Sequence, residues 1–211
     1  SVCPDLEVLN LGMNAIGPDQ ELLVLEHHGL ALEPDIVLCQ VLEDNDFTDV
    51  ACTINGYWPK PWFRRTSEEL ELVPPRHPWH VRLRESSYLG EAVYRVMQAR
   101  MTYKELAPEW DGADTSGLIA RILVRMRTIS SAHGSRFVVL LVTTGKRSRE
   151  MTSLRNALAR EAVETVLVRA WFTTPEERAR LLLPDGHWTA AGHRLAAEEL
   201  RAELVRLGWL P

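Results

Sequence analysis

The sequence predicts an α/β fold in which a mostly parallel sheet carries helices on both faces. Three runs of apolar and β-branched residues, 7–11, 35–41 and 137–142, have the composition of strands buried on both faces, and residues 165–168 form a weaker fourth run. Segments with the period of a helix separate these runs. Because parallel strands need helical crossover connections, this alternation favours an α/β class.

The first helix is expected between the first two strands. Pro18 suits the first turn of a helix, and Gly29 lies close to its predicted end. Apolar residues recur at helical spacing between these two positions, so residues 7–41 are predicted to form a β-α-β unit. The apolar residues of this helix are Leu22, Leu23, Leu25 and Leu30.

Three further helices are expected in the second half of the chain. The longest is predicted over residues 115–132, because its apolar side chains share one face and Gly134 can end it. A shorter helix is expected over residues 151–160. The closing helix begins after Thr189, a residue type that caps helix N-termini. The shared face of the longest helix consists of Leu118, Ile119, Ile122, Leu123 and Met126.

Over residues 50–84 the apolar residues follow neither the spacing of a helix nor that of a strand, and Pro and Trp are frequent. Such a segment is typical of an ordered excursion from the sheet. Its aromatic residues either line an acyl or sugar pocket or form a small core at the sheet edge, and the second interpretation is favoured. A helix is expected next, over residues 86–101. The aromatic residues are Trp58, Trp62, Phe63 and Trp79, and the apolar face of the helix is Leu89, Val93, Val96 and Met97.

Length and composition predict one domain spanning residues 1–211 and exclude several classes of protein. The formal net charge of −5 gives no basic surface of the kind that phosphate backbones require, so nucleic acid is not an expected partner. The longest apolar run, 137–142, is too short to span a bilayer. The three cysteines show no paired spacing, so neither a disulfide framework nor a zinc ribbon is predicted. No metal and no cofactor are expected.

A loop near the C-terminus combines an acid with a histidine. Asp185, Gly186 and His187 come just before the closing helix. An aspartate two residues before a histidine can bond Nδ1 of the ring and leave Nε2 facing outward, which makes a general base. In the alternative interpretation, Asp185 and Gly186 are turn residues and His187 is a surface histidine.

Two other loops are expected at the same edge of the sheet. Asn10 and Gly12 follow the first predicted strand, and the helix after them can present N–H groups to an anion. Asn45 and Asp46 follow the second predicted strand. Sites in open parallel sheets are built at the carboxyl ends of strands, so the three loops are expected to converge there.

Three blocks of the chain resemble conserved blocks of the SGNH/GDSL hydrolase family. VLNLGMNAIGPDQELL is similar to the second block of that family, PDIVLCQVLEDNDFTD to the third and LPDGHWTAAGHRLAAEEL to the last. KPWF and RLRESSYLGEAVYRVMQAR also resemble a bacterial subgroup that has an aromatic excursion. The resemblance covers nearly the whole chain, and the blocks occur in the order of the family.

The resemblance implies a three-layer, flavodoxin-like α/β/α fold and the hydrolysis of acyl esters by a Ser-His-Asp mechanism. His187 would be the general base and Asp185 its orienting partner. The side chain of Asn45 and the backbone N–H of Ala15 would bind the oxyanion that develops in the transition state. The substrate would be an acylated small molecule, lipid or glycan.

The chain departs from the family pattern at several positions. It has no Gly-Asp-Ser block, which carries the nucleophile of the family, and no similar pattern follows Ser1. Ala15 stands where the family usually has Gly, and Glu43 stands where Gly is frequent. The Asp lies two positions before the His instead of the commoner three. The chain starts without Met just before the second block. We therefore expect the strand-Ser-helix segment outside this chain, and the chain alone to be inactive.

Two alternative functions remain open at this stage. A degenerate member of the family would bind an acylated glycan or a protein partner without hydrolysing it. A flavodoxin-like or nucleotide-binding domain is more remote, because GMNAIG does not have the spacing of a dinucleotide-binding loop. The ester substrate, the compartment and the oligomeric state are left open.

Overall fold

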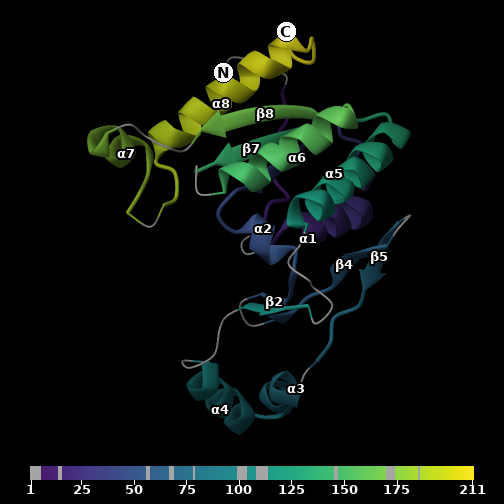
Figure 1. Ribbon diagram of the computed structural model, residues 1–211, viewed down its shortest axis with the longest axis vertical. Helices are drawn as coiled ribbons and strands as arrows, with labels where there is room; N and C mark the ends of the chain where they lie inside the picture. Colours follow the sequence, from purple (N-terminus) through teal and green to yellow (C-terminus); the bar gives the residue numbers. More distant parts are fainter. Residues whose placement is uncertain are drawn as a thin grey trace.

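A computed structural model shows an α/β chain whose parallel sheet carries helices on both faces (Figure 1). The fold class predicted from the sequence is confirmed at this level. The structure describes residues 6–13, 16–55, 58–66, 69–77, 79–98, 104–107, 114–144, 147–169, 174–184 and 186–211.

Three of the four predicted strands form the sheet. Strands β1 (Ile36–Leu42), β7 (Arg136–Thr143) and β8 (Glu164–Arg169) run parallel in the order β1-β7-β8. The central strand β7 is buried at every position after Arg136. Its continuous apolar run follows from this burial, because both faces of a central parallel strand are covered.

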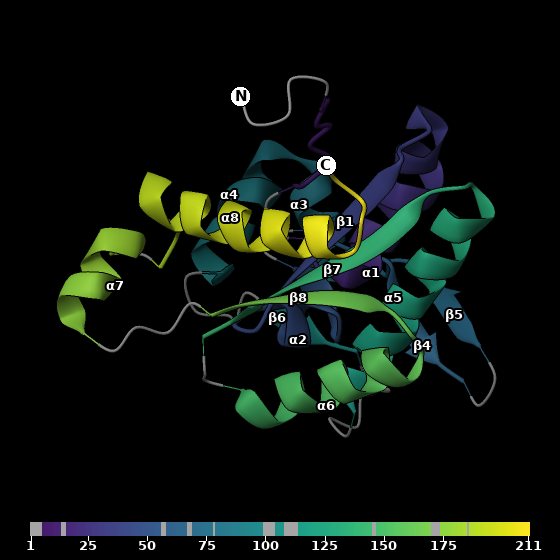
Figure 2. The same cartoon turned by 90° about the horizontal axis from the view of Figure 1, so that it is seen from above.

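Three helices cover one face of the sheet (Figure 2). Helices α1 (Pro18–Val24), α5 (Thr115–Ala132) and α6 (Ser148–Arg160) pack against β1, β7 and β8, respectively. After α1 the chain continues through a π-helical turn, Leu25–Gly29, and a 3-10 turn, Leu30–Leu32, past the predicted end of this helix. The five residues of the predicted apolar face of α5 are all buried.

The long helix α8 (Ala190–Arg206) lies on the other face of the sheet and packs against α7 (Pro175–Leu181). Thr189 caps α8 as predicted, because its Oγ1 accepts a hydrogen bond from the N–H of Gly192 at 3.2 Å. The apolar side chains of α8 bury those of β7 and β8. On β1, Leu38 remains 46% exposed.

The first predicted strand is wrong. Residues 6–13 are not a strand, and Leu6, Val8 and Leu9 are each more than half exposed. A strand requires a neighbour with which it exchanges backbone hydrogen bonds, and within the described residues β1 pairs with β7 alone. The helix of the predicted β-α-β unit therefore forms without its first strand.

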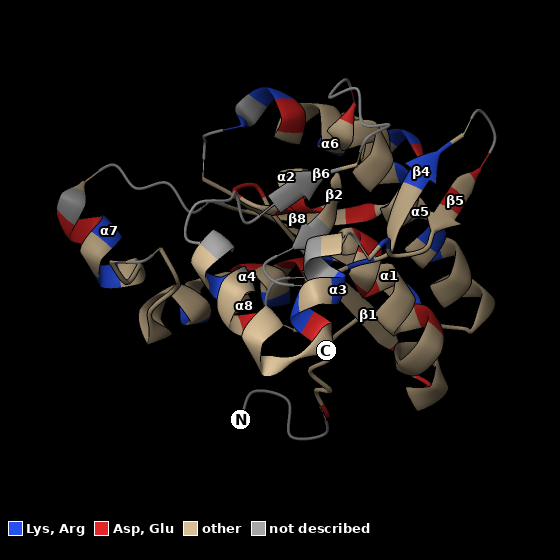
Figure 3. Cartoon of the chain, turned by 90° about the horizontal axis from the view of Figure 1, so that it is seen from below, with Lys and Arg blue, Asp and Glu red and all other residues tan. Residues whose placement is uncertain are grey.

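The excursion after β1 and the short helix α2 (Asp46–Asp49) extends beyond the predicted residues 50–84. It contains two small antiparallel sheets, one ordered β3-β2-β6 and the other β4-β5. Figure 3 shows the basic residues of β4 beside the acidic residue of β5, and Arg64 Nη2 lies 2.7 Å from Glu71 Oε2. The strands are β2 (Cys52–Asn55), β3 (Trp58–Pro59), β4 (Trp62–Arg65), β5 (Leu70–Val73) and β6 (Lys104–Leu106).

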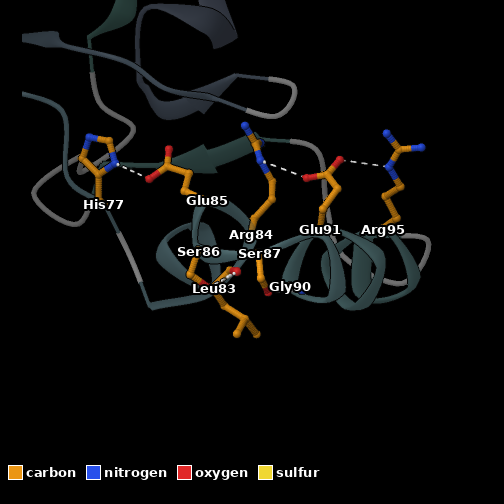
Figure 4. A network of polar contacts seen from close by, with 9 residues as sticks. All are labelled: His77, Leu83, Arg84, Glu85, Ser86, Ser87, Gly90, Glu91 and Arg95. Atoms are coloured by element: carbon orange, nitrogen blue, oxygen red, sulfur yellow. Dashed lines mark hydrogen bonds and ion pairs between the residues drawn. The ribbon is translucent and has the colours of Figure 1, made fainter.

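The helix predicted over residues 86–101 is found over residues 88–98, and a second helix over residues 79–86 lies in the segment where no helix was expected (Figure 4). Helices α3 (Trp79–Ser86) and α4 (Tyr88–Gln98) meet at Ser87, whose Oγ accepts a hydrogen bond from the N–H of Gly90 at 3.0 Å. That bond satisfies an N–H group in the first turn of α4, so Ser87 acts as a cap and a new helix begins there. The predicted apolar face of α4 is exposed at Leu89, Val93 and Val96, and the Met97 side chain lies outside the described part.

Candidate active site

The carboxyl ends of the three parallel strands lie at one edge of the sheet, where two of the three predicted loops occur. Asn45 follows β1, and His187 lies in the loop that joins α7 to α8 after β8 (Figure 2). Strand β7 lies between β1 and β8. The third predicted loop differs, because Asn10 and Gly12 follow no strand. There the Oδ1 of Asn10 accepts a hydrogen bond from the N–H of Gly12 at 2.9 Å.

Asn45 stands at the N-terminus of α2. Its backbone carbonyl accepts hydrogen bonds from the N–H groups of Thr48 and Asp49, both at 2.8 Å. Its side-chain Nδ2 donates to Asp46 Oδ1 at 3.1 Å and to Asp49 Oδ2 at 3.0 Å. The amide therefore has to turn away from these carboxylates before it can donate to a substrate oxyanion. The position fits the expected donor, and the role stays a prediction.

Asp46 ties the start of α2 back to β1. Its Oδ2 accepts a hydrogen bond from the N–H of Leu42 at 2.6 Å, while its Oδ1 accepts the bond from Asn45. Burial raises the pKa of Asp46 from 3.8 to about 8, and nearby carboxylates add to the rise. Protonation of Asp46 near neutral pH lowers the negative charge that is packed beneath Asn45.

Glu43 is completely buried at the end of β1, and the sequence did not reveal its role. Its Oε2 accepts hydrogen bonds from the hydroxyl of Thr143 at 2.7 Å and from the N–H of Thr144, and its Oε1 accepts one from the N–H of Arg147 at 2.5 Å. These bonds hold the loop after β7 against the end of β1. The available signal was a glutamate directly after an apolar strand, because a buried carboxylate requires several donors.

Further ionisable groups cluster between α1, β1 and the excursion. Asp19 forms a buried ion pair with Lys60, and the Cys39 thiol donates to Glu21 Oε2 at 3.0 Å. Burial raises the pKa of Asp19 to about 6, against the lowering effect of Lys60, and it raises the pKa of Glu21 to about 7. Burial also raises the pKa of the Cys39 thiol. Cys39 is therefore a buried hydrogen-bond donor, and the raised pKa of its thiol disfavours the thiolate form.

The loop before α8 is a tight turn with an exposed His187 side chain. Gly186 has a φ of 93°, a left-handed conformation that favours glycine, and its N–H donates to the carbonyl of Leu183 at 3.0 Å. The N–H of Leu183 donates in turn to the carbonyl of His187 at 2.7 Å. Asp185 and Ala15 lie outside the described residues. The Asp185–His187 pair and the Ala15 donor therefore stay predictions.

Close packing of α7 against α8 supports this turn. A Cβ atom at Gly192 would lie 2.4 Å from the carbonyl oxygen of Leu181, so a residue with a side chain cannot make this approach. The ring of Trp188 meets the ring of His193 edge-on, with 5.4 Å between the centroids. This contact indicates a packing role for His193 in the turn.

The aromatic residues of the excursion divide into a buried and an exposed group. Trp62 and Phe63 are buried, and Phe63 belongs to the same core as α1 and α5. Trp79 is 66% exposed, and the side chain of Trp58 lies outside the described part. Burial of Trp62 and Phe63 favours a packing role over a pocket, but Phe63 joins the main core and not a separate small one, and the exposed Trp79 belongs to neither.

Comparison with known proteins found no match. No protein-family model matches the chain, and neither does any curated protein or solved structure. No helix in the described ranges is long and apolar enough to cross a membrane. Across the same residues, no group of three or more His, Cys, Asp or Glu side chains is arranged to hold a metal ion.

Proposed function

We propose that the chain forms the larger part of an SGNH-type serine ester hydrolase that acts on an acylated small molecule, lipid or glycan. The nucleophilic serine would be supplied by a strand that pairs with the outer edge of β1. The observation that carries this proposal is the position of Asn45 at the carboxyl end of β1. The outer edge of β1, away from β7, pairs with no other described strand.

The exposed surface of β1 supports the addition of a strand. Leu38 and Gln40 are exposed on the face that α8 covers for β7 and β8, whereas Cys39 and Val41 on the opposite face are buried. Parallel sheets ordinarily have both faces covered. Residues 6–13 carry further exposed apolar side chains. One added strand with its helix would bury part of this apolar surface.

The geometry of a parallel sheet brings such a strand close to Asn45. Neighbouring strands lie about 4.8 Å apart, and parallel neighbours have their carboxyl ends at the same edge. A serine at the end of the added strand would therefore lie within side-chain reach of Asn45. On the same spacing the carboxyl end of β8 lies about 10 Å from that of β1. His187 comes later, between α7 and α8, so its loop would have to fold toward β1 around the turn at Gly186.

The reaction would follow the sequence of steps known for serine esterases. The Oγ of the serine would attack the ester carbonyl while Nε2 of His187 takes its proton, with Asp185 holding the ring. The Asn45 amide and the Ala15 N–H would stabilise the tetrahedral oxyanion. His187 would then return the proton to the leaving alcohol. A water molecule would finally attack the acyl-enzyme, release the acid and regenerate the serine.

Ester hydrolysis by the product of the complete gene tests this proposal. We expect turnover of short p-nitrophenyl esters and covalent labelling of one serine by a fluorophosphonate probe. Asn45→Ala should lower kcat by about 10²–10³-fold, because one oxyanion donor is lost, and His187→Ala should abolish measurable turnover. His193→Ala is the matched control and should retain activity. If the 211-residue chain alone hydrolyses esters and loses this activity on His187→Ala, the nucleophilic serine lies within this chain and the proposed added strand is wrong.

A non-catalytic binding module is the second candidate. The observation that favours it is that the Asn45 amide donates to two carboxylates of α2 instead of facing solvent. A complete gene product that binds acylated glycans but neither hydrolyses esters nor reacts with the probe would establish this alternative.

A further inference from the structure

The side-chain amide of Asn45 is held by two carboxylates of α2, and this arrangement decides what else it can bind. Its Nδ2 donates to Asp46 Oδ1 at 3.1 Å and to Asp49 Oδ2 at 3.0 Å. A primary amide has two N–H groups. Both are therefore used within α2, and neither is left for an acceptor beyond the edge of the sheet.

The carboxyl group of Asp46 can change this count through one of its oxygens. Its Oδ2 accepts a hydrogen bond from the N–H of Leu42 at 2.6 Å, so this oxygen has to stay an acceptor. Its Oδ1 faces the amide of Asn45. A proton taken up by Asp46 therefore belongs on Oδ1, which then carries a hydroxyl group and becomes a donor. The N–H of Asn45 that pointed at this oxygen loses its charged acceptor and can turn toward another one.

Asp46 is packed where a carboxyl group readily keeps its proton. Its side chain is buried, and burial disfavours the charged form because water no longer stabilises it. Neighbouring carboxylates disfavour a further negative charge. These causes raise the pKa of Asp46 to about 8, against the lowering effect of the Leu42 N–H.

Ionisable groups from the elements that pack around α2 surround Asp46. Lys60 forms its ion pair with Asp19. Arg147 donates to Thr48 Oγ1 at 3.1 Å, so both cations are engaged with other partners. Helix α5 meets α2 through the main apolar core. The surrounding groups are Glu21 and Asp19 of α1, Cys39 of β1, Glu43 after β1, Asp49 of α2, Cys52 of β2, Lys60 and Arg147.

We propose that Asp46 is a positioning residue whose protonation controls the amide of Asn45. The ionised carboxylate holds both N–H groups of the amide within α2, and the protonated carboxyl group releases one of them toward the edge of the sheet. The consequence for catalysis rests on the proposed function, in which Asn45 binds the oxyanion. Release would supply that donor, and loss of the negative charge beside it would favour the developing oxyanion further.

The expected pH dependence has the opposite sign to that of a histidine base. A general base has to be deprotonated, so its contribution to activity rises with pH. Asp46 releases the amide in its protonated form, so activity should fall as the pH rises through the pKa of Asp46, about 8. A hydrogen bond to a charged group changes an equilibrium by about tenfold or more, so we expect a fall of about tenfold.

Nuclear magnetic resonance of the Cγ carbons in the 211-residue chain tests the release without any need for ester hydrolysis. The Cγ signals of Asp46 and Asn45 should shift together as the pH is raised through the pKa of about 8. Asp46→Asn resembles the protonated carboxyl group in shape and can donate in its place, so the Asn45 signal should no longer shift with pH. Asp44→Asn, at the exposed neighbouring position, is the matched control and should titrate like the parent.

The pH profile of the complete gene product is the second measurement. The kcat/KM for a short ester, corrected for spontaneous hydrolysis, should fall about tenfold on the alkaline side in the parent and in Asp44→Asn. In Asp46→Asn it should stay level there. A residue that only supported the fold would not move this limb of the profile. Urea unfolding should show that Asp46→Asn is folded across the range, because the substitution removes a buried charge and keeps the shape.

Three results would overturn the proposal. The first is an Asn45 signal that stays constant while Asp46 titrates, because the amide would then be independent of this carboxyl group. The second is titration of Asp46 at the ordinary pKa of an aspartate. The third is the same alkaline fall of kcat/KM in the parent and in Asp46→Asn. A complete gene product that hydrolyses no ester would instead overturn the proposed hydrolase, and the Cγ titration would still decide the role of Asp46.

Discussion

The substitution Glu21→Gln tests the account of the acidic cluster beneath the site. Glu21 lies on α1 and accepts a hydrogen bond from the Cys39 thiol of β1 at 3.0 Å. Burial raises the pKa of Glu21 from 4.5 to about 7, and the charge of Asp19 adds to the rise. Glutamine has nearly the same shape, keeps an oxygen that can accept the thiol bond, and carries no charge at any pH.

The sign of the effect follows from proton linkage. Between pH 4.5 and about 7, the folded chain holds the Glu21 proton more tightly than the unfolded chain does. The stabilisation is therefore fully present below pH 4.5 and is lost as the pH rises through 7. The pKa difference is about 2.5, and one pKa unit corresponds to about 1.4 kcal/mol, so the loss is at most about 3 kcal/mol for this partly exposed side chain.

Urea unfolding followed by tryptophan fluorescence measures this loss. Below pH 4.5 the variant and the parent should have similar free energies of unfolding, and above pH 7 the variant should be more stable by up to about 3 kcal/mol. The stability of the variant should still fall with pH, because Asp19 and Asp46 also have raised pKa values. The stability of the parent should fall more steeply, because Glu21 adds to the loss. Glu161→Gln, at an exposed position, should leave the pH dependence unchanged. Parallel pH curves for the parent and Glu21→Gln would refute the reasoning.

Three further substitutions probe the fold, the first two measured as a change in the free energy of unfolding. Thr189→Ala removes the cap of α8 and should cost about 1 kcal/mol; no change would mean that another group caps this helix. Leu123→Ala opens a cavity in the main core and should cost about 2–5 kcal/mol. Gly90→Ala forces a methyl group onto the carbonyl oxygen of Leu83 and should separate α3 from α4, and an unchanged near-ultraviolet circular dichroism spectrum would contradict this close approach of the two helices.

The sequence predicted the elements whose signals are local. Helix α5 has its apolar face within one continuous segment, and all five residues expected on that face are buried. Strand β7 is an apolar run whose composition alone indicates burial on both faces, and β8 is the weaker apolar run. The cap at Thr189 depends only on the neighbouring N–H groups of the same helix.

Features that depend on distant neighbours were not predictable. Residues 7–11 have the composition of a strand, but a strand forms only beside a partner. The sequence marked Glu43 only as a position where the resembled family often has Gly. Its buried role could not be predicted, because its hydrogen-bond donors lie about 100 positions later in the chain. The ion pair between Asp19 and Lys60 likewise joins segments 41 positions apart. Sequence reasoning therefore pointed to the loops after β1 and before α8, but not to the buried groups that support the end of β1.

The outer edge of β1 indicates which element the proposed hydrolase needs. This edge presents backbone N–H and C=O groups that no described strand satisfies, and an open sheet edge is satisfied by another strand. Beside this edge, Leu38 and Gln40 are exposed on the face that α8 covers for β7 and β8. Parallel sheets ordinarily have both faces covered, so a strand that adds at β1 should bring a helix that covers this face.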